Sequence, residues 1–246
     1  MPAKPLAFTL TDLPGWSNLP VRGGTSERPD SMGWENPGRS DAREAFLNSL
    51  GASLDGLVLP WQVHGTRVVR VAAEDRGRGA QERANALPET DALLTDASSV
   101  ALGVLTADCF PLFFCDPSHG AVAIAHAGWK GTAAGIASKM VGVLGKTFDT
   151  DPGEVRVAIG PGIRACCYEV QSDVAAQFPS FISVRDGKFF LDLIDANRRQ
   201  FLESGILPER ISDGGFCTRC EGERFFSHRR EGPAAGRMLS VIALSS

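Results

Sequence analysis

At 246 residues, with 43% hydrophobic and 22% charged residues, the chain has the composition of a globular protein large enough to bury a core. The net charge of −4 and the lack of a lysine- and arginine-rich run argue against a nucleic-acid partner, so we expect a small-molecule ligand. The sequence begins without the apolar core of a signal peptide, and no apolar run could cross a bilayer, which predicts a cytoplasmic protein without a membrane partner. Six cysteines in such a chain indicate reduced thiols, available for metal binding or catalysis.

The first forty residues are poor in periodic pattern and rich in turn-forming pairs such as Pro14-Gly15 and Pro37-Gly38. Within them, residues 22–26 (Arg-Gly-Gly-Thr-Ser) form a candidate anion-facing loop. Glycines let backbone N–H groups turn toward a ligand, and Arg22 can form paired hydrogen bonds with phosphate. A solvated turn is the competing interpretation of this weak motif.

Beyond this segment the pattern predicts one helix and several short strands. Ser40 begins a helix with apolar positions at Phe46, Leu47 and Leu50, and Gly51 ends it. Apolar runs predict strands at residues 57–59, 68–71, 91–96 and 100–105, with an exposed loop at residues 75–81.

Two further buried strands follow within residues 106–131, with Cys109 at the front and His126 at the back. His126 ends an apolar strand and is followed at once by glycines, which suits a binding site as well as a buried histidine satisfied by a backbone carbonyl. His64 also lies beside a glycine after an apolar run, and Gln62 would point the same way as His64. The second histidine favours a site.

The second half of the chain alternates helices, strands and loops. Helices are expected at residues 131–148, from Ser172, and at residues 191–204, where Ile194, Phe201 and Leu202 share an apolar face. Strands are expected at residues 154–159 and 238–244, and the first of these leads into a rigid Gly-Pro-Gly turn and a cysteine-containing loop. No repeat or linker divides the sequence, which predicts a single domain over residues 1–246 with mixed strands and helices.

His64, Cys109 and His126 form a His2Cys set, which is a ligand set that zinc accepts in catalytic sites with an open fourth position. Their separations of 45 and 17 residues match no local finger motif, so the prediction depends on each residue lying at a strand end. Asp108 could orient a ligand histidine or contact a substrate hydroxyl.

The remaining cysteines suggest less. Cys217 and Cys220 have the spacing of half a zinc finger, but no second pair has that spacing, so a free loop pair is the favoured interpretation. Adjacent Cys166 and Cys167 cannot readily bridge each other, so one is expected to face the pocket. Five cations are candidates for contact with an anionic ligand: Arg22, Lys130, Arg229, Arg230 and Arg237.

Seven ordered motifs resemble one family across nearly the whole chain. They are RGGTS at 22–26, QVHG at 62–65, TADC at 106–109, HAGWKG at 126–131, IGPGI at 159–163, CCYEV at 166–170, and FFSHRR with GR at 225–237. The chain is similar to the family once labelled multicopper polyphenol oxidase (laccase-like), also called peptidoglycan editing factor, whose members are described as purine nucleoside phosphorylases.

The resemblance implies an α+β fold of four layers, α/β/β/α, with two packed mixed sheets, similar to the deamidase domain of a bacterial cytotoxic necrotising toxin. It implies a zinc ion on His64, Cys109 and His126, and Arg22 near the bound nucleoside or phosphate. It also implies phosphorolysis of adenosine, inosine and methylthioadenosine to base and ribose 1-phosphate, together with hydrolytic deamination of adenosine. We therefore expect a monomer or homodimer with Cys109, His126 and Asp108 as catalytic residues, and substrate contacts from Arg22, Gln62, Lys130, Cys166 and Arg237.

Three other functions remain open. Cys109 and His126 could form a metal-free thiol hydrolase or deamidase, although such a pair does not require His64. A copper-dependent polyphenol oxidase is disfavoured because four histidines are too few for an imidazole-based multicopper cluster, although copper could replace zinc. A non-enzymatic protein with a structural zinc would need a fourth ligand, for which Cys166 or Cys167 is the candidate. The donor that protonates the leaving base is also open among Asp108, Cys166 and Glu169.

Overall fold

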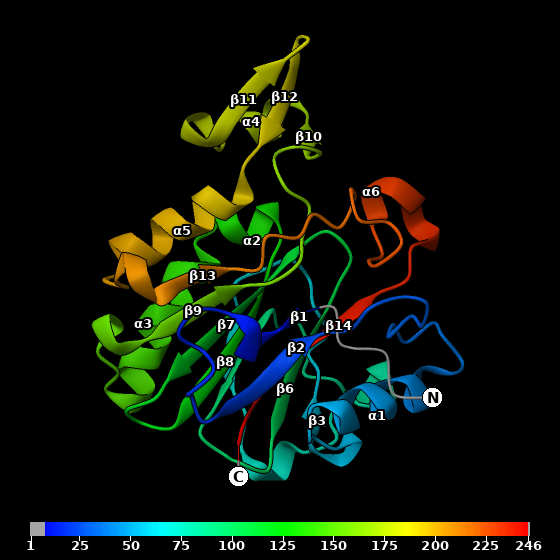
Figure 1. Cartoon of the computed structure of the whole chain (residues 1–246), viewed down its shortest axis with the longest axis vertical. Helices are drawn as coiled ribbons and strands as arrows, with labels where there is room; N and C mark the ends of the chain where they lie inside the picture. Colours follow the sequence, from blue (N-terminus) through cyan, green and yellow to red (C-terminus); the bar gives the residue numbers. More distant parts are fainter. Residues whose placement is uncertain (1–7, 246) are drawn as a thin grey trace.

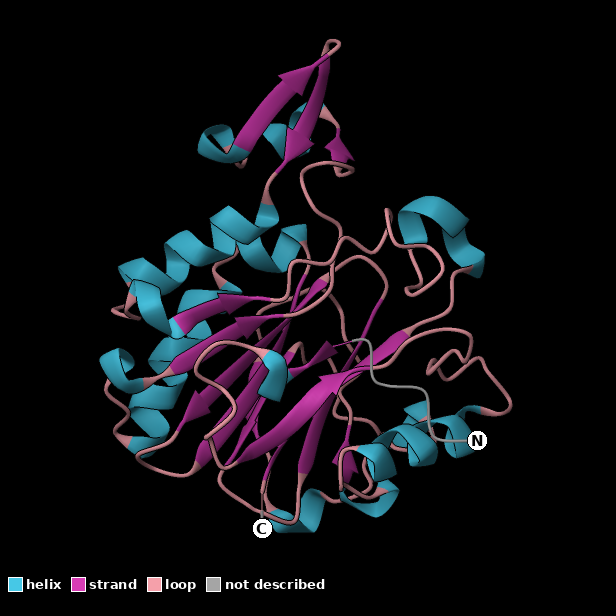
Figure 2. Cartoon of the chain, in the orientation of Figure 1, coloured by secondary structure: helices cyan, strands magenta, loops and turns pink. Residues whose placement is uncertain are grey.

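The structure is a computed structural model that describes residues 8–245. Two large mixed sheets occupy the middle of the molecule, helices cover their outer faces, and a small antiparallel sheet stands at one end (Figures 1 and 2). No helix among the described residues is long and apolar enough to span a membrane.

The five-stranded sheet contains both the early and the final strands of the described chain. Its order is β1 (Phe8–Thr9), β2 (Val21–Thr25), β14 (Met238–Leu244), β6 (Ala101–Thr106) and β3 (Leu57–Val58), and only the β3–β6 pair is parallel.

The interpretation of residues 22–26 as a loop or turn is wrong, because four of them lie within β2. Gly23 and Gly24 serve close strand packing: a Cβ on Gly23 would meet the Val241 carbonyl oxygen at 2.4 Å, and one on Gly24 would meet that of Phe8 at 2.3 Å.

The six-stranded sheet carries the central stretch of the sequence. Its order is β13 (Ile211–Asp213), β9 (Arg156–Ile159), β7 (Phe110–Asp116), β8 (Ala121–Ala127), β5 (Ala92–Thr95) and β4 (Val68–Arg70), with parallel pairs at the two edges. The β7–β8 hairpin pairs Phe110 with Ala127 and Pro111 with His126. This register brings Cys109, just before β7, to the end of β8 where His126 lies.

Three apolar cores separate four layers, which confirms the α/β/β/α arrangement. Side chains such as Val104, Phe113 and Ile242 fill the space between the two large sheets. The outer face of the six-stranded sheet packs against α3 (Ile136–Phe148) and α5 (Leu193–Glu203). The outer face of the five-stranded sheet packs against α1 (Arg39–Ser49). β8 ends at Ala127, and the chain passes through Gly128 directly into α2 (Trp129–Ala133).

The helices differ from the predicted ones in two respects. Residues 131–148 were expected to form one helix, but Gly135, with φ of +80°, separates α2 (Trp129–Ala133) from α3. On α5, Ile194 and Phe201 are buried as expected, whereas Leu202 is 38% exposed and does not share their face.

A small antiparallel sheet lies beyond α5, at the top of Figure 1. It consists of β10 (Glu169–Val170), β12 (Lys188–Leu191) and β11 (Ile182–Arg185), with the short α4 (Ser172–Ala175) beside it, and α6 (His228–Glu231) lies in a separate loop region. A helix from Ser172 was predicted and corresponds to α4, whereas the β11–β12 hairpin was not predicted. Its signal is the Asp186-Gly187 pair, whose φ values of +49° and +72° suit a two-residue turn.

Candidate metal centre and pocket

His64, Cys109 and His126 come together at the end of the β7–β8 hairpin. One ring nitrogen of each histidine and the Cys109 sulfur all lie within 4.8 Å of one another. The two imidazole rings meet edge to face, with centroids 4.7 Å apart. His126 is buried, Cys109 is partly buried and His64 is exposed, so the three donors face a point that is accessible from one side.

Asp91 orients both histidines, and the sequence analysis missed this role. One carboxylate oxygen lies 2.9 Å from Nδ1 of His126 and also accepts the backbone N–H of His64 at 2.9 Å. The other accepts the backbone N–H groups of Val63 and Gly65 at 3.1 and 2.7 Å. Because a carboxylate on Nδ1 leaves Nε2 free to bind a metal, Asp91 prepares His126 as a ligand. These bonds also hold His64 at φ of +61°.

The glycine after the hairpin leaves the space that the donors occupy. A Cβ on Gly128 would lie 2.8 Å from the Cys109 sulfur and 3.1 Å from Cδ2 of His64. Only glycine therefore fits there without displacing a donor. A convergent His2Cys set, an oriented imidazole and an open side together fit a zinc ion with a free coordination position.

Without a metal, the same residues form a charged pair. Burial opposes ionisation of Cys109, but the neighbouring His126 charge and hydrogen bonds from both histidines lower the pKa of the thiol to about 6. Burial likewise opposes protonation of His126, yet the Cys109 thiolate and Asp91 raise its pKa to about 9. The geometry thus favours a thiolate, which is the form of cysteine that binds metals.

The donors open into a pocket of about 540 Å³. Its wall combines aromatic and cationic side chains from distant parts of the chain. They include Trp61, Arg83, Tyr168, His228, Arg229 and Arg237. Trp61 is 44% exposed, and the Arg83 guanidinium lies 4.1 Å from the centre of its ring.

Asp108 joins the pocket to the last loops of the chain. Its carboxylate accepts the Thr218 hydroxyl at 2.7 Å and the Arg229 backbone N–H at 2.6 Å. Both oxygens are therefore used as acceptors, and the residue is only 8% exposed with φ of +93°. This arrangement holds a carboxylate beside Cys109 at the pocket wall.

The other expected substrate contacts divide into two groups. Gln62 and Arg237 line the pocket, as does Asp108, but the Gln62 amide is paired with the backbone of Leu105 through bonds of 2.9 and 2.8 Å. Lys130 and Cys166 are exposed and do not line it. Arg22 lines a separate hollow of about 290 Å³ that contains none of the metal-donor residues. Arg83 is a pocket cation that the sequence analysis missed because it lies in an irregular segment.

Cys166 and Cys167 belong to a second cysteine group and not to the His2Cys set. The expectation that one of them could close the His2Cys site with a fourth ligand therefore has no support in the geometry of the described residues.

The fold and the site define a four-layer α+β protein with a candidate His2Cys metal centre in an aromatic and cationic pocket. The family model described as multi-copper polyphenol oxidoreductase laccase matches residues 39–245, and the chain belongs to this family. The resemblance inferred from the seven motifs is therefore confirmed.

Relatives and solved structures agree with this assignment. The chain is 42% identical over 209 residues to purine nucleoside phosphorylase YlmD of Geobacillus stearothermophilus, covering 81% of this chain and 76% of the relative. It is 37% identical over 214 residues to adenosine deaminase RL5 of an unknown prokaryotic organism, covering 82% and 80%. The crystal structure of YlmD from Geobacillus stearothermophilus superposes with a TM-score of 0.87 at 35% identity, covering 92% and 93% of the two chains.

Proposed function

We propose that the chain is a zinc-dependent purine nucleoside phosphorylase that cleaves adenosine, inosine and methylthioadenosine with phosphate and also deaminates adenosine. The observation that carries the proposal is the convergence of His64, Cys109 and His126 within 4.8 Å at the wall of a pocket of about 540 Å³. The relatives named purine nucleoside phosphorylase and adenosine deaminase support the same reactions.

Zinc bound by these three residues would supply a Lewis acid that lowers the pKa of a water molecule toward neutrality. The chain's own residues do the rest. Trp61 presents an exposed aromatic surface to which a purine ring can bind. Arg229, Arg237 and His228 line the same pocket and offer donors for the phosphate.

Asp108 and Tyr168 suit different parts of phosphorolysis. Asp108 lines the pocket beside Cys109, and the hydrogen bonds from Thr218 and Arg229 hold its carboxylate there, where its negative charge can stabilise positive charge that develops on the sugar. Burial and the nearby Cys109 raise the pKa of Tyr168, so its phenol remains a neutral donor. We therefore assign the proton or hydrogen bond to the leaving base to Tyr168 rather than to Cys166 or Glu169, which lie outside the pocket lining.

The experiment is a phosphate-dependent turnover assay on the three nucleosides, with metal content measured on each protein. His64→Ala should lose turnover by more than the 10- to 100-fold that is typical of outer-shell changes, and should lose one zinc ion per chain. His119→Ala is the matched control, since His119 pairs with Asp116 outside the pocket and should leave turnover unchanged. Turnover that survives His64→Ala, or that does not require phosphate, would contradict the proposal.

A metal-free thiol hydrolase is the second candidate, and the Cys109–His126 pair favours it. The two functions differ in their response to chelation. A phosphorylase that needs zinc loses activity when the metal is removed and regains it when zinc is restored. A thiol enzyme keeps its activity in the metal-free state and loses it to alkylation of Cys109.

A further inference from the structure

Four of the six cysteines gather outside the pocket lining. The sulfurs of Cys166, Cys167, Cys217 and Cys220 all lie within 4.8 Å of one another. Cys166 lies 3.6 Å from both Cys217 and Cys220, and Cys167 lies 3.3 Å from Cys220. Four thiolates around one zinc ion, each at about 2.3 Å, stand about 3.8 Å apart in a tetrahedron. The observed spacings are close to that value and well beyond the roughly 2.05 Å of a disulfide bond.

Two loops build this cysteine cluster, and their backbones pair beside it. Residues 160–168 follow β9, and residues 214–227 follow β13, its parallel neighbour. Gly162 and Cys217 form a parallel bridge, and the Thr218 N–H donates to the Gly162 carbonyl at 3.1 Å. The two loops therefore bring two cysteine pairs together that are about fifty residues apart in sequence.

Hydrogen bonds fix the loop around Cys217. The side chain of Cys217 is buried, and its backbone N–H donates to a carboxylate oxygen of Glu221 at 3.2 Å. The Glu221 backbone N–H donates in return to the Cys217 carbonyl oxygen at 3.0 Å. The Cys-Thr-Arg-Cys segment is therefore held as a closed turn, with both of its cysteines in the cluster.

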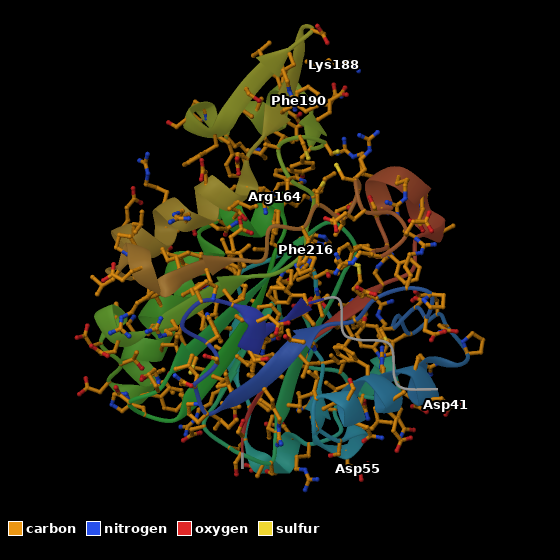
Figure 3. The ribbon with its side chains drawn as sticks, in the orientation of Figure 1. Asp41, Asp55, Arg164, Lys188, Phe190 and Phe216 are labelled. Carbon is orange, nitrogen blue, oxygen red and sulfur yellow. The ribbon has the colours of Figure 1, made fainter. Side chains whose placement is uncertain are left out.

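Arginine side chains brace the same loops. Arg164, labelled in Figure 3, forms a paired salt bridge with Asp213 at 2.9 and 2.8 Å. Arg230 donates to the carbonyl oxygens of Thr218 and Arg219 at 2.9 and 3.1 Å. These contacts hold the backbones of the two loops that carry the cysteines.

We propose that Cys166, Cys167, Cys217 and Cys220 bind a second, structural zinc ion as a tetrathiolate site. Four protein ligands leave no open position, so the site would hold the two loops together rather than act on substrate. The first loop carries Tyr168, which lines the pocket. Thr218 of the second loop donates to Asp108, which also accepts the Arg229 backbone N–H, and both of these residues line the pocket. The ion would therefore fix one wall of the pocket. The proposal does not depend on which reaction the pocket catalyses.

The prediction that Cys217 and Cys220 are a free loop pair rested on the lack of a second pair with the same spacing. The structure offers the adjacent cysteines 166 and 167 instead, and only the pairing of the loops reveals them.

Metal content of purified single variants tests the assignment. We expect about two zinc ions per chain in the wild type, about one in Cys220→Ser and about one in His64→Ala. The double variant should contain none. Cys220 is exposed and belongs to none of the three apolar cores, so its replacement by serine should leave those cores folded although the two loops lose the ion that joins them. Cys115→Ala is the matched control, because Cys115 is buried in the core between the sheets and outside both groups, and it should retain two zinc ions.

A second measurement uses a protein in which all four cysteines are present. The His64→Ala variant loaded with cobalt should show the charge-transfer and ligand-field absorption of a tetrahedral tetrathiolate site. The double variant that also carries Cys220→Ser should lack this absorption. The proposal would be overturned by a His64→Ala protein that binds no metal while its four thiols react freely or form disulfides. Iron in place of zinc in this variant would overturn the assignment of the metal.

Discussion

Asp91 and Asp116 are both buried aspartates that pair with a histidine, but they lie in different surroundings. Asp91 binds His126 and the turn that carries His64. Asp116 binds His119 at 2.8 Å, away from the pocket. Substitutions at the two positions can therefore be compared: Asp91 contacts candidate metal donors, whereas Asp116 contacts none of them and supports the fold alone.

Asp91→Asn should weaken zinc binding by roughly 10- to 100-fold, because an amide cannot hold the imidazole and three backbone N–H groups as a carboxylate does. Competition with a chelator of known affinity measures the change, and a urea titration checks that the protein remains folded. Asp116→Asn is the matched control and should leave zinc affinity unchanged. Equal zinc affinity in the two variants would refute the role of Asp91.

Gly128 offers a second test at the scale of one residue. Gly128→Ala places a methyl group 2.8 Å from the Cys109 sulfur, so it should lower zinc occupancy while the sheets remain folded. Gly142→Ala on α3 is the control, because its Cβ meets nothing within 4 Å and alanine should stabilise the helix by about 0.5–1 kcal/mol. Full zinc occupancy in Gly128→Ala would contradict the close fit described here.

At the scale of secondary structure, Asp116 ties the β7–β8 turn to the end of α3. Its carboxylate accepts the Thr150 hydroxyl at 2.5 Å and the backbone N–H groups of Ser118 and His119 at 3.0 and 3.2 Å. Burial raises the pKa of Asp116, but the bonds from Thr150 and His119 outweigh burial, and the net pKa falls below 3.8. The hairpin and the helix are therefore joined through an ionised side chain.

Asp116→Asn should lower the free energy of unfolding by about 1–3 kcal/mol at neutral pH. Because the pKa is lower in the folded state, this contribution is present above the unfolded pKa and is lost as the pH falls through the folded pKa. The difference between wild type and variant should therefore shrink below about pH 3.8. Urea unfolding across pH measures it, and a difference that stays constant into this acid range would contradict the account.

Asp96→Asn is the matched control for that titration. Asp96 pairs with Arg70 at 3.0 Å, and both side chains are largely exposed. Removing this pair should change the free energy of unfolding by less than about 1 kcal/mol.

A helix or strand can be predicted from the sequence when its own residues carry the pattern that defines it. The apolar runs of β7 and β8 are long and fully buried, so their residues alone locate them. The helix break was missed because a single glycine such as Gly135 is tolerated within a helical pattern, and the exposure of Leu202 was missed because it depends on tertiary packing. The hairpin of β11 and β12 was missed because its signal is the Asp186-Gly187 turn, which a search for apolar periodicity does not detect.

The residues of the candidate site also differ in how clearly the sequence indicates them. His64, Cys109 and His126 were predictable because each is a metal-binding side chain at the end of an apolar run, and the structure brings them together. Asp91 was missed because a buried aspartate at the start of a strand has no distinctive neighbours in sequence. Arg22 was placed near an anionic ligand by its glycine-rich motif and near the substrate by resemblance, but it lies in β2 and lines a different hollow.

At the scale of the whole molecule, the pocket draws on nearly every part of the fold. Trp34 precedes α1, His126 ends β8, Tyr168 precedes the small sheet and Arg237 precedes β14. The two large sheets position the donors, and the irregular segments add the aromatic and cationic side chains. A ligand that fills this pocket would therefore contact segments from both halves of the sequence.

Diffraction at the zinc absorption edge from crystals of the wild-type protein soaked with a nucleoside would test whether the three donors bind zinc beside a nucleoside site. We expect an anomalous peak between His64, Cys109 and His126, with the purine in the pocket beside Trp61. A nucleoside bound instead in the hollow that Arg22 lines, or no anomalous peak among the three donors, would contradict it.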